Sequence, residues 1–131
     1  MPKFGRDDED WSRLLEAGRE FLIERAKLGN FTSYTELNAV LERRIGLGFD
    51  FNQDADRFTM GQLLGEISKE HMEEIGQRFM ISSLVYYLNQ NDVGPGFYKE
   101  AIELGLLKPK KDRLKFWIDQ HKAVFAYYSK K

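Results

Sequence analysis

Side chains that could act as a nucleophile, a general base or a metal ligand are few and widely spaced in this chain. The two histidines, His71 and His121, each lie in an apolar run with helical spacing, where an imidazole most often packs in the core. Ser82 and Ser83 with His71 could form a nucleophile and a base, but an extended segment lacks the strained turn that presents a nucleophilic serine. The chain has no cysteine and no close pair of histidines for zinc. We therefore predict a protein that is not an enzyme and that has no catalytic residue, metal site or cofactor.

One acidic segment has part of the spacing of a calcium loop. Asp50, Asn52 and Asp54 stand at its first, third and fifth positions. Ala55 then stands where the sharp turn needs glycine, and Gly61 stands where a bidentate glutamate is required. Residues 46–56 are therefore predicted to be an acidic surface loop.

We expect the chain to be organised around the segment from Met80 to Phe97, MISSLVYYLNQNDVGPGF. Its first half has β-branched and aromatic residues on both faces of an extended chain, which predicts a covered β-strand. The turn formers Asn89 to Asp92 and the Gly94-Pro95-Gly96 turn then predict a hairpin or wing that leads into a helix. The backbone N–H groups of that turn could bind an anion, but Pro95 has none, so a structural turn is favoured.

Apolar residues at helical spacing predict five helices in the rest of the chain. Ser33 with Glu36, and Thr59 with Gln62, have the spacing of capping boxes at two of the helix starts. The predicted helices run from Trp11 to about Gly29, then over 33–45, 59–75, 97–104 and 114–128. The last helix has an aromatic stripe that is typical of core packing, formed by Leu114, Trp117, Ile118, His121, Phe125 and Tyr128.

Gly61 and Gly65 lie one turn apart on the third predicted helix. A glycine inside a helix costs about 1 kcal/mol relative to alanine, so the pair indicates that another backbone approaches closely. The partner is either another helix of the core, which we favour, or a nucleic-acid backbone.

The composition is that of an ordinary globular protein. The chain has 131 residues, of which 42% are hydrophobic and 31% charged, and we expect a single domain over 1–131 with 1–10 flexible. No apolar run approaches the roughly 18 residues of a membrane span, and the start lacks a signal-peptide core, so we expect a cytoplasmic protein without a membrane partner. The net charge of −1 is uneven, because residues 106–131 carry eight basic and two acidic side chains, or +6, which leaves −7 on residues 1–105.

Several short segments between Thr32 and Leu106 form an ordered series of motifs. They are Thr32 to Leu37, an arginine and a glycine at Arg57 and Gly61, the strand ending Leu84-Val85, a glycine-bearing wing, and Glu103 to Leu106. Through them, residues 31–107 resemble the winged-helix domain of alkylguanine-DNA alkyltransferases and alkyltransferase-like proteins. Small bacterial and phage proteins also look similar through the Leu-Val and Gly-Pro-Gly-Phe region.

The resemblance implies a helix-turn-helix pair over 33–45 and 59–75 that grips DNA through its second helix. The chain departs from the family at the reactive centre, where the family has Pro-Cys-His-Arg-Val. Here Ser82 replaces the alkyl-accepting thiolate and Ser83 replaces the histidine, which excludes alkyl transfer. The spacing from Arg57 to Gly61 is also one residue longer than the family pattern.

These observations predict a helix-rich α+β domain with winged-helix-like topology, whose core spans 31–107. The predicted function is a non-catalytic protein that binds DNA or RNA. The alternative is a protein-interaction module, an adaptor or inhibitor, on the same scaffold. The predicted nucleic-acid contacts are Tyr34, Arg57, Asn91, Gly94, Gly96, Lys108, Lys110, Lys111 and Arg113.

Overall fold

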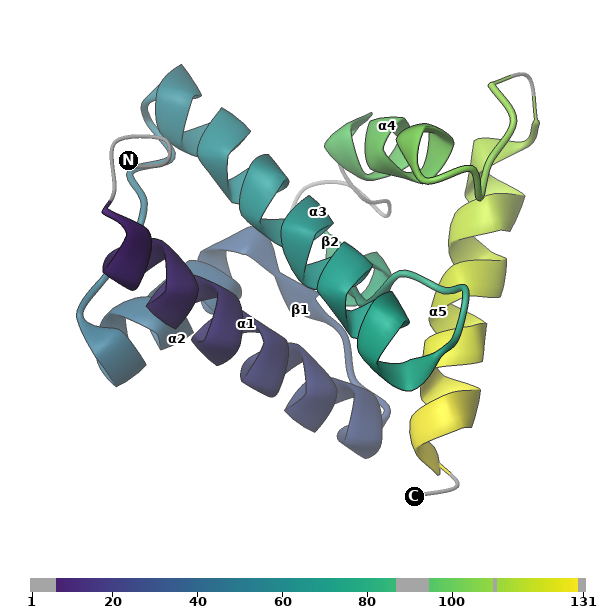
Figure 1. Cartoon of the computed structure of the whole chain (residues 1–131), viewed down its shortest axis with the longest axis horizontal. Coiled ribbons are helices and arrows are strands. Elements are labelled where there is room, and N and C mark those ends of the chain that lie inside the picture. Colours follow the sequence, from purple (N-terminus) through teal and green to yellow (C-terminus); the bar gives the residue numbers. More distant parts are fainter. Residues whose placement is uncertain (1–6, 87–94, 110, 130–131) are drawn as a thin grey trace.

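The computed structural model describes residues 7–86, 95–109 and 111–129, and this part of the chain is helix-rich α+β, as predicted (Figure 1). Two short strands pair in parallel, with Thr32 opposite Val85 and Ser33 opposite Tyr86. The elements in order are α1 (Asp8–Leu28), β1 (Thr32–Ser33), α2 (Tyr34–Ile45), α3 (Asp54–Ile75), the 3₁₀ helix η1 (Ile81–Leu84), β2 (Val85–Tyr86), α4 (Pro95–Glu103) and α5 (Arg113–Ser129).

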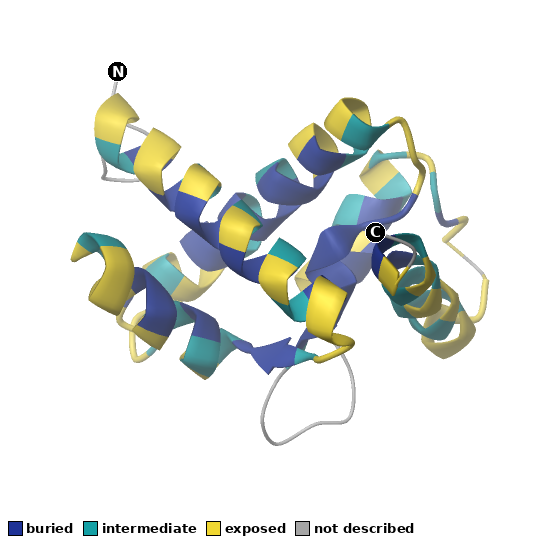
Figure 2. Cartoon of the chain, turned by 90° about the horizontal axis from the view of Figure 1, so that it is seen from below, coloured by how far each residue is buried: buried dark blue, intermediate teal, exposed yellow. Residues whose placement is uncertain are grey.

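The short 3₁₀ helix η1 lies at the centre of the molecule. It packs against α1, α3 and α5, and both Ile81 and Leu84 are fully buried. Figure 2 shows the buried residues on the inward faces of the surrounding helices and the exposed residues on their outer faces. A second, smaller apolar cluster, which includes Met80, Phe97 and Tyr98, lies beneath α4.

The predicted strand over the first half of 80–97 is wrong for Ile81 to Leu84, and only Val85 and Tyr86 are extended. The reason lies in the hydrogen bonds of this segment. The Ser83 N–H donates to the Met80 carbonyl at 3.0 Å, which closes a helical turn. Other polar groups of the turn bind side chains of α3 and α5 instead of a neighbouring strand, so the apolar residues are buried without a sheet. The predicted turn at Asn89 to Asp92 lies outside the described residues.

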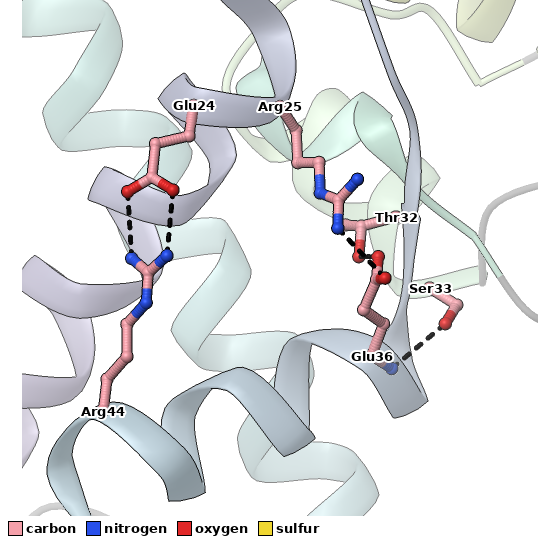
Figure 3. Close-up of polar contacts among 6 residues, drawn as sticks. All are labelled: Glu24, Arg25, Thr32, Ser33, Glu36 and Arg44. Atoms are coloured by element: carbon pink, nitrogen blue, oxygen red, sulfur yellow. Dashed lines mark hydrogen bonds and ion pairs between the residues drawn. The ribbon is translucent and has the colours of Figure 1, made fainter. Parts of the chain in front are cut away.

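The capping box at the start of α2 forms in half. The Glu36 N–H donates to the Ser33 Oγ at 3.1 Å, as predicted. The Glu36 carboxylate, however, accepts a hydrogen bond of 2.5 Å from the Thr32 hydroxyl and pairs with Arg25 of α1 at 3.0 Å (Figure 3). The side chain that would have closed the box therefore ties α2 and β1 to α1.

A second contact joins α1 to the far end of α2. Arg44 donates two hydrogen bonds to the Glu24 carboxylate, at 2.8 and 3.0 Å (Figure 3). Hydrogen bonding from Arg44 lowers the pKa of Glu24. Because both side chains are largely exposed, this pair orients the two helices and adds little to stability.

Helix α3 begins at Asp54, one turn before the predicted start, and the loop before it is correspondingly shorter. The predicted capping box at Thr59 and Gln62 is wrong, because Thr59 lies inside the helix and its hydroxyl donates to the Ala55 carbonyl at 2.7 Å. Asp54 and Asp56 in the first turn complement the helix dipole. Asp50 accepts hydrogen bonds from the backbone of Asn52 and the side chain of Gln53, so it serves the loop itself.

The predicted aromatic stripe of α5 is correct for its aromatic residues from Trp117 onward, since Trp117 is half-buried and its ring lies 6.1 Å from that of Phe31. Tyr128 is buried, and Phe125 and His121 are half-buried against Phe31. Leu114 is 50% exposed, contrary to the prediction, because α1 and η1 pack against later turns of the helix. Within the described residues, no helix has the length and apolar character to span a membrane.

Two helix-interior glycines give a test of how tightly α1 and α3 pack. A Cβ at Gly18 would lie 2.8 Å from the Cδ1 of the buried Ile67, whereas a Cβ at Gly61 would meet no described atom within 4 Å. Gly61→Ala should raise the free energy of unfolding by about 1 kcal/mol through helix propensity alone. Gly18→Ala has the same gain but should be net destabilising, because overpacking a core typically costs about 1–3 kcal/mol. Urea unfolding of the two variants measures this difference, and an equal gain from both would contradict the close packing of α1 on α3.

Candidate functional site

The structure divides the predicted contact residues into two groups at opposite ends of α4. Tyr34 and Gly96 line the same small cavity near the start of α4. Lys108, Lys111 and Arg113 come after the last residue of α4. The helix itself is about 13 Å long, which separates the two groups. Arg57 belongs to neither group and lies in the first turn of α3, while Asn91, Gly94 and Lys110 lie outside the described residues.

The cavity lies where α2, α3, η1 and α4 meet. Its volume is about 10 Å³, close to the space that one water molecule needs. It is lined by Tyr34, Gly61, Leu64, Gly65, Ser82, Gly96, Phe97 and Glu100. Three of these residues are glycines, so backbone forms much of the wall, and in this conformation there is no room for a nucleobase.

Ser82 is the cavity residue that stands where the resemblance places the acceptor thiolate. Its Oγ accepts a hydrogen bond of 2.8 Å from the Ser68 hydroxyl, and its N–H donates to the Ser68 Oγ at 3.1 Å. Ser82 is also 5% exposed. Both polar groups of Ser82 thus join η1 to α3, and no hydrogen bond to a general base is present among the described residues.

His71 is not the base of such a pair. Its Nε2 lies 2.5 Å from the hydroxyl of Tyr128 on α5, and its Nδ1 has no hydrogen-bond partner among the described residues. Burial lowers the pKa of His71 to about 4 and raises the pKa of Tyr128 to about 12. Both groups are therefore neutral at physiological pH and serve to join α3 to α5.

Glu100 lies on the α4 side of the cavity, above Gly65. A Cβ at Gly65 would come within 2.5 Å of the Glu100 carboxylate, so the missing side chain makes the space that this carboxylate fills. Among the described residues the Glu100 carboxylate makes no hydrogen bond or ion pair, and burial raises its pKa. The predicted approach of another backbone is wrong, because the group against Gly65 is a side chain of α4 and a Cβ at Gly61 would meet no described atom within 4 Å.

Arg57 is engaged within its own turn. Its guanidinium donates to the Phe51 carbonyl and pairs with Asp54. The helix that follows carries six acidic and two basic side chains over Asp54–Ile75, a net charge of −4. Contact with phosphate along α3 would therefore meet like charge, and Arg57 would have to leave its carboxylate.

The cationic group after α4 has different surroundings. Lys108, Lys111 and Arg113 are all exposed, and none of them forms an ion pair within the part of the chain that the structure describes. The guanidinium of Arg113 lies over the ring of Tyr98, 5.4 Å from its centre, which fixes its position beside α4. These side chains can contact an anionic partner without breaking an ion pair.

Residues that the sequence did not single out complete this picture. Nothing in the spacing of Glu100 distinguishes it from the other acids, and the partner of Ser82 depends on η1 being helical. No three His, Asp or Glu side chains among the described residues are placed to hold a metal ion.

Comparison of the chain with protein-family models, curated proteins and solved structures gives no significant match.

The buried imidazole of His71 predicts a loss of stability in acid. The unfolded chain takes up a proton near pH 6.5, whereas the folded protein takes it up only near pH 4, so protonation favours the unfolded state between these values. The free energy of unfolding should fall by roughly 3 kcal/mol over this range because of His71. Urea unfolding at several pH values should show a shallower dependence in His71→Gln than in the parent protein. Equal dependence in the two proteins would assign the acid sensitivity to other groups.

The half-buried carboxyl of Glu100 predicts the opposite dependence on pH. Because its pKa is raised in the folded state, the charged form is disfavoured there, and this cost is present at pH values above the folded pKa. Glu100→Gln should therefore raise the melting temperature at pH 8, and the gain should shrink as the pH falls through the carboxyl pKa. Glu70→Gln on α3, where the side chain is exposed, is the matched control. A gain in the control as large as that in Glu100→Gln would show that the effect is general to the acids of the protein.

Proposed function

We propose that this chain is a non-catalytic, cytoplasmic protein of winged-helix type that binds nucleic acid. The observation that carries the proposal is the concentration of exposed cations after α4. Residues 106–131 have a net charge of +6, and Lys108, Lys111 and Arg113 lie together on one connector and the start of α5. Exposed lysine and arginine side chains without acidic partners bind phosphate by releasing its counterions.

The order of the elements supports the winged-helix part of the proposal. Helices α2 and α3 follow β1, and β2 returns beside β1. In the sequence, residues 87–94 stand between β2 and α4, where the resemblance has its wing. In the resemblance this order belongs to a DNA-binding domain, and the loss of the acceptor thiolate at Ser82 leaves binding as the activity that the scaffold retains.

The charge on α3 indicates which surface makes the contact. If α3 contacted DNA as the second helix of the resembling family does, its net charge of −4 would repel the phosphates. Cations elsewhere in the protein would have to offset that repulsion. We therefore place the principal contact at Lys108, Lys111 and Arg113. Tyr34 and Gly96, near the start of α4, are secondary positions, and Asn91 and Gly94 stay predicted contacts.

A protein-interaction module is the second candidate, and the same helix favours it. The start of α3 combines the exposed Asp54 and the half-buried Asp56 with Phe58, whose side chain is 56% exposed. A large aromatic residue among carboxylates is more readily covered by a protein with basic and apolar side chains than by nucleic acid.

Anisotropy of labelled DNA and RNA at several salt concentrations tests the proposal. Changing Lys108 and Lys111 together to Gln should weaken binding and should flatten the plot of log affinity against log salt by about one for each lysine. The control replaces Lys27 and Arg43, two exposed cations on α1 and α2, by Gln with the same change in net charge.

Equal loss in the two double variants would show that only net charge matters and would contradict the assigned surface. Absence of binding by the parent protein even at low salt would contradict nucleic-acid binding itself, and the protein-interaction module would then be the better explanation.

A further inference from the structure

A shallow groove runs between the end of α4 and the first turns of α5. Its volume is about 460 Å³, within the range of roughly 300–1,000 Å³ that is usual for ligand sites. Its floor is apolar and is formed by Leu106, Leu107 and Phe116. Phe116 is half-buried, and its ring lies 5.9 Å from that of Phe97, which holds it in place against α4.

The rim of the groove is cationic. Lys108, Lys111 and Lys115 all lie along it. The two acids on the same rim are already engaged, because Asp119 pairs with Lys115 at 2.8 Å and Asp112 accepts the backbone N–H of Lys115 at 3.1 Å. Lys108 and Lys111 are left facing a groove with an aromatic floor.

We infer that this groove binds single-stranded nucleic acid, with a base against Phe116 and the backbone along Lys108 and Lys111. The inference rests on the proposed function and names its ligand. Stacking of bases on an aromatic ring, beside cations that follow the phosphates, is the usual way in which proteins hold single strands.

The form of the site disfavours a duplex. The faces of paired bases are covered by their neighbours in a double helix, so a duplex could use the lysines but not the phenyl ring. A single strand can turn one base onto the ring while its phosphates contact the rim. The apolar floor would therefore add affinity for a single strand only.

The experiment compares a labelled single-stranded oligonucleotide with a duplex of the same sequence, using the full chain. The parent protein should bind the single strand at least tenfold more tightly than the duplex. Phe116→Leu keeps an apolar side chain but removes the stacking surface, so it should weaken single-strand binding roughly tenfold and leave duplex binding unchanged. Phe58→Leu, on the exposed start of α3, is the matched control and should bind as the parent does.

A second measurement does not depend on how Phe116→Leu folds. A single strand that carries a photoreactive iodouracil should crosslink to the parent protein within residues 106–119, as located by mass spectrometry. Crosslinks only to other segments would overturn the inference.

The outcomes separate this inference from the proposed function. Equal affinity for single strand and duplex, or an unchanged affinity in a folded Phe116→Leu variant, would overturn the groove assignment while nucleic-acid binding remained. Failure of both nucleic acids to bind would contradict both proposals. Binding of an acidic peptide in their place would assign the groove to a protein partner.

Discussion

The fold depends on how the buried polar groups of η1 are satisfied. A turn of four residues at the centre of the core exposes backbone groups that no sheet can pair, and each unpaired group would cost about 1–3 kcal/mol. Side chains from two helices supply the partners. Ser68 of α3 binds the N–H and Oγ of Ser82, and Trp117 of α5 donates to the Ser83 carbonyl at 2.7 Å. Gln120, also on α5, accepts the N–H of Met80 at 2.7 Å. The position of η1 therefore sets the positions of α3 and α5 relative to each other.

This arrangement explains which features could be predicted from the sequence. Helices with long apolar stripes, such as α1, which also ends at a glycine, and α5, are determined by local pattern, and their existence was predicted correctly. The segment Ile81 to Leu84 has β-branched and apolar residues but is helical, because the side chains that bind its polar groups lie 14 and 34 residues away in sequence. No local pattern records such partners. The start of α3 is predicted too late because Asp54 and Asp56, the acids of its first turn, are also typical of a loop.

The candidate site could be predicted only in part, for related reasons. Charge is visible in the sequence, so the cationic group at Lys108, Lys111 and Arg113 could be identified before its surroundings were known. The pairing of Arg57 with Asp54 could not, because it depends on α3 beginning at Asp54. The glycine pair predicted an approaching backbone, whereas the structure has a side chain against Gly65 and no described atom near Gly61. That the approaching group is a carboxylate follows from the position of α4, which depends on the residues beneath it.

The buried polar residues of the core and the exposed cations after α4 also differ in which amino-acid substitutions the fold tolerates. Ser82, His71 and Tyr128 are buried and each is used to join two elements, so a new role for any of them would remove a contact on which the core depends. Lys108 and Lys111 stabilise nothing else among the described residues, and their exposure has no structural requirement. A binding function placed on the connector and the start of α5 can therefore vary independently of the fold. This separation is the physical reason to look for the partner at the carboxyl-terminal end of α4, although the resemblance directs attention to the cavity at Ser82.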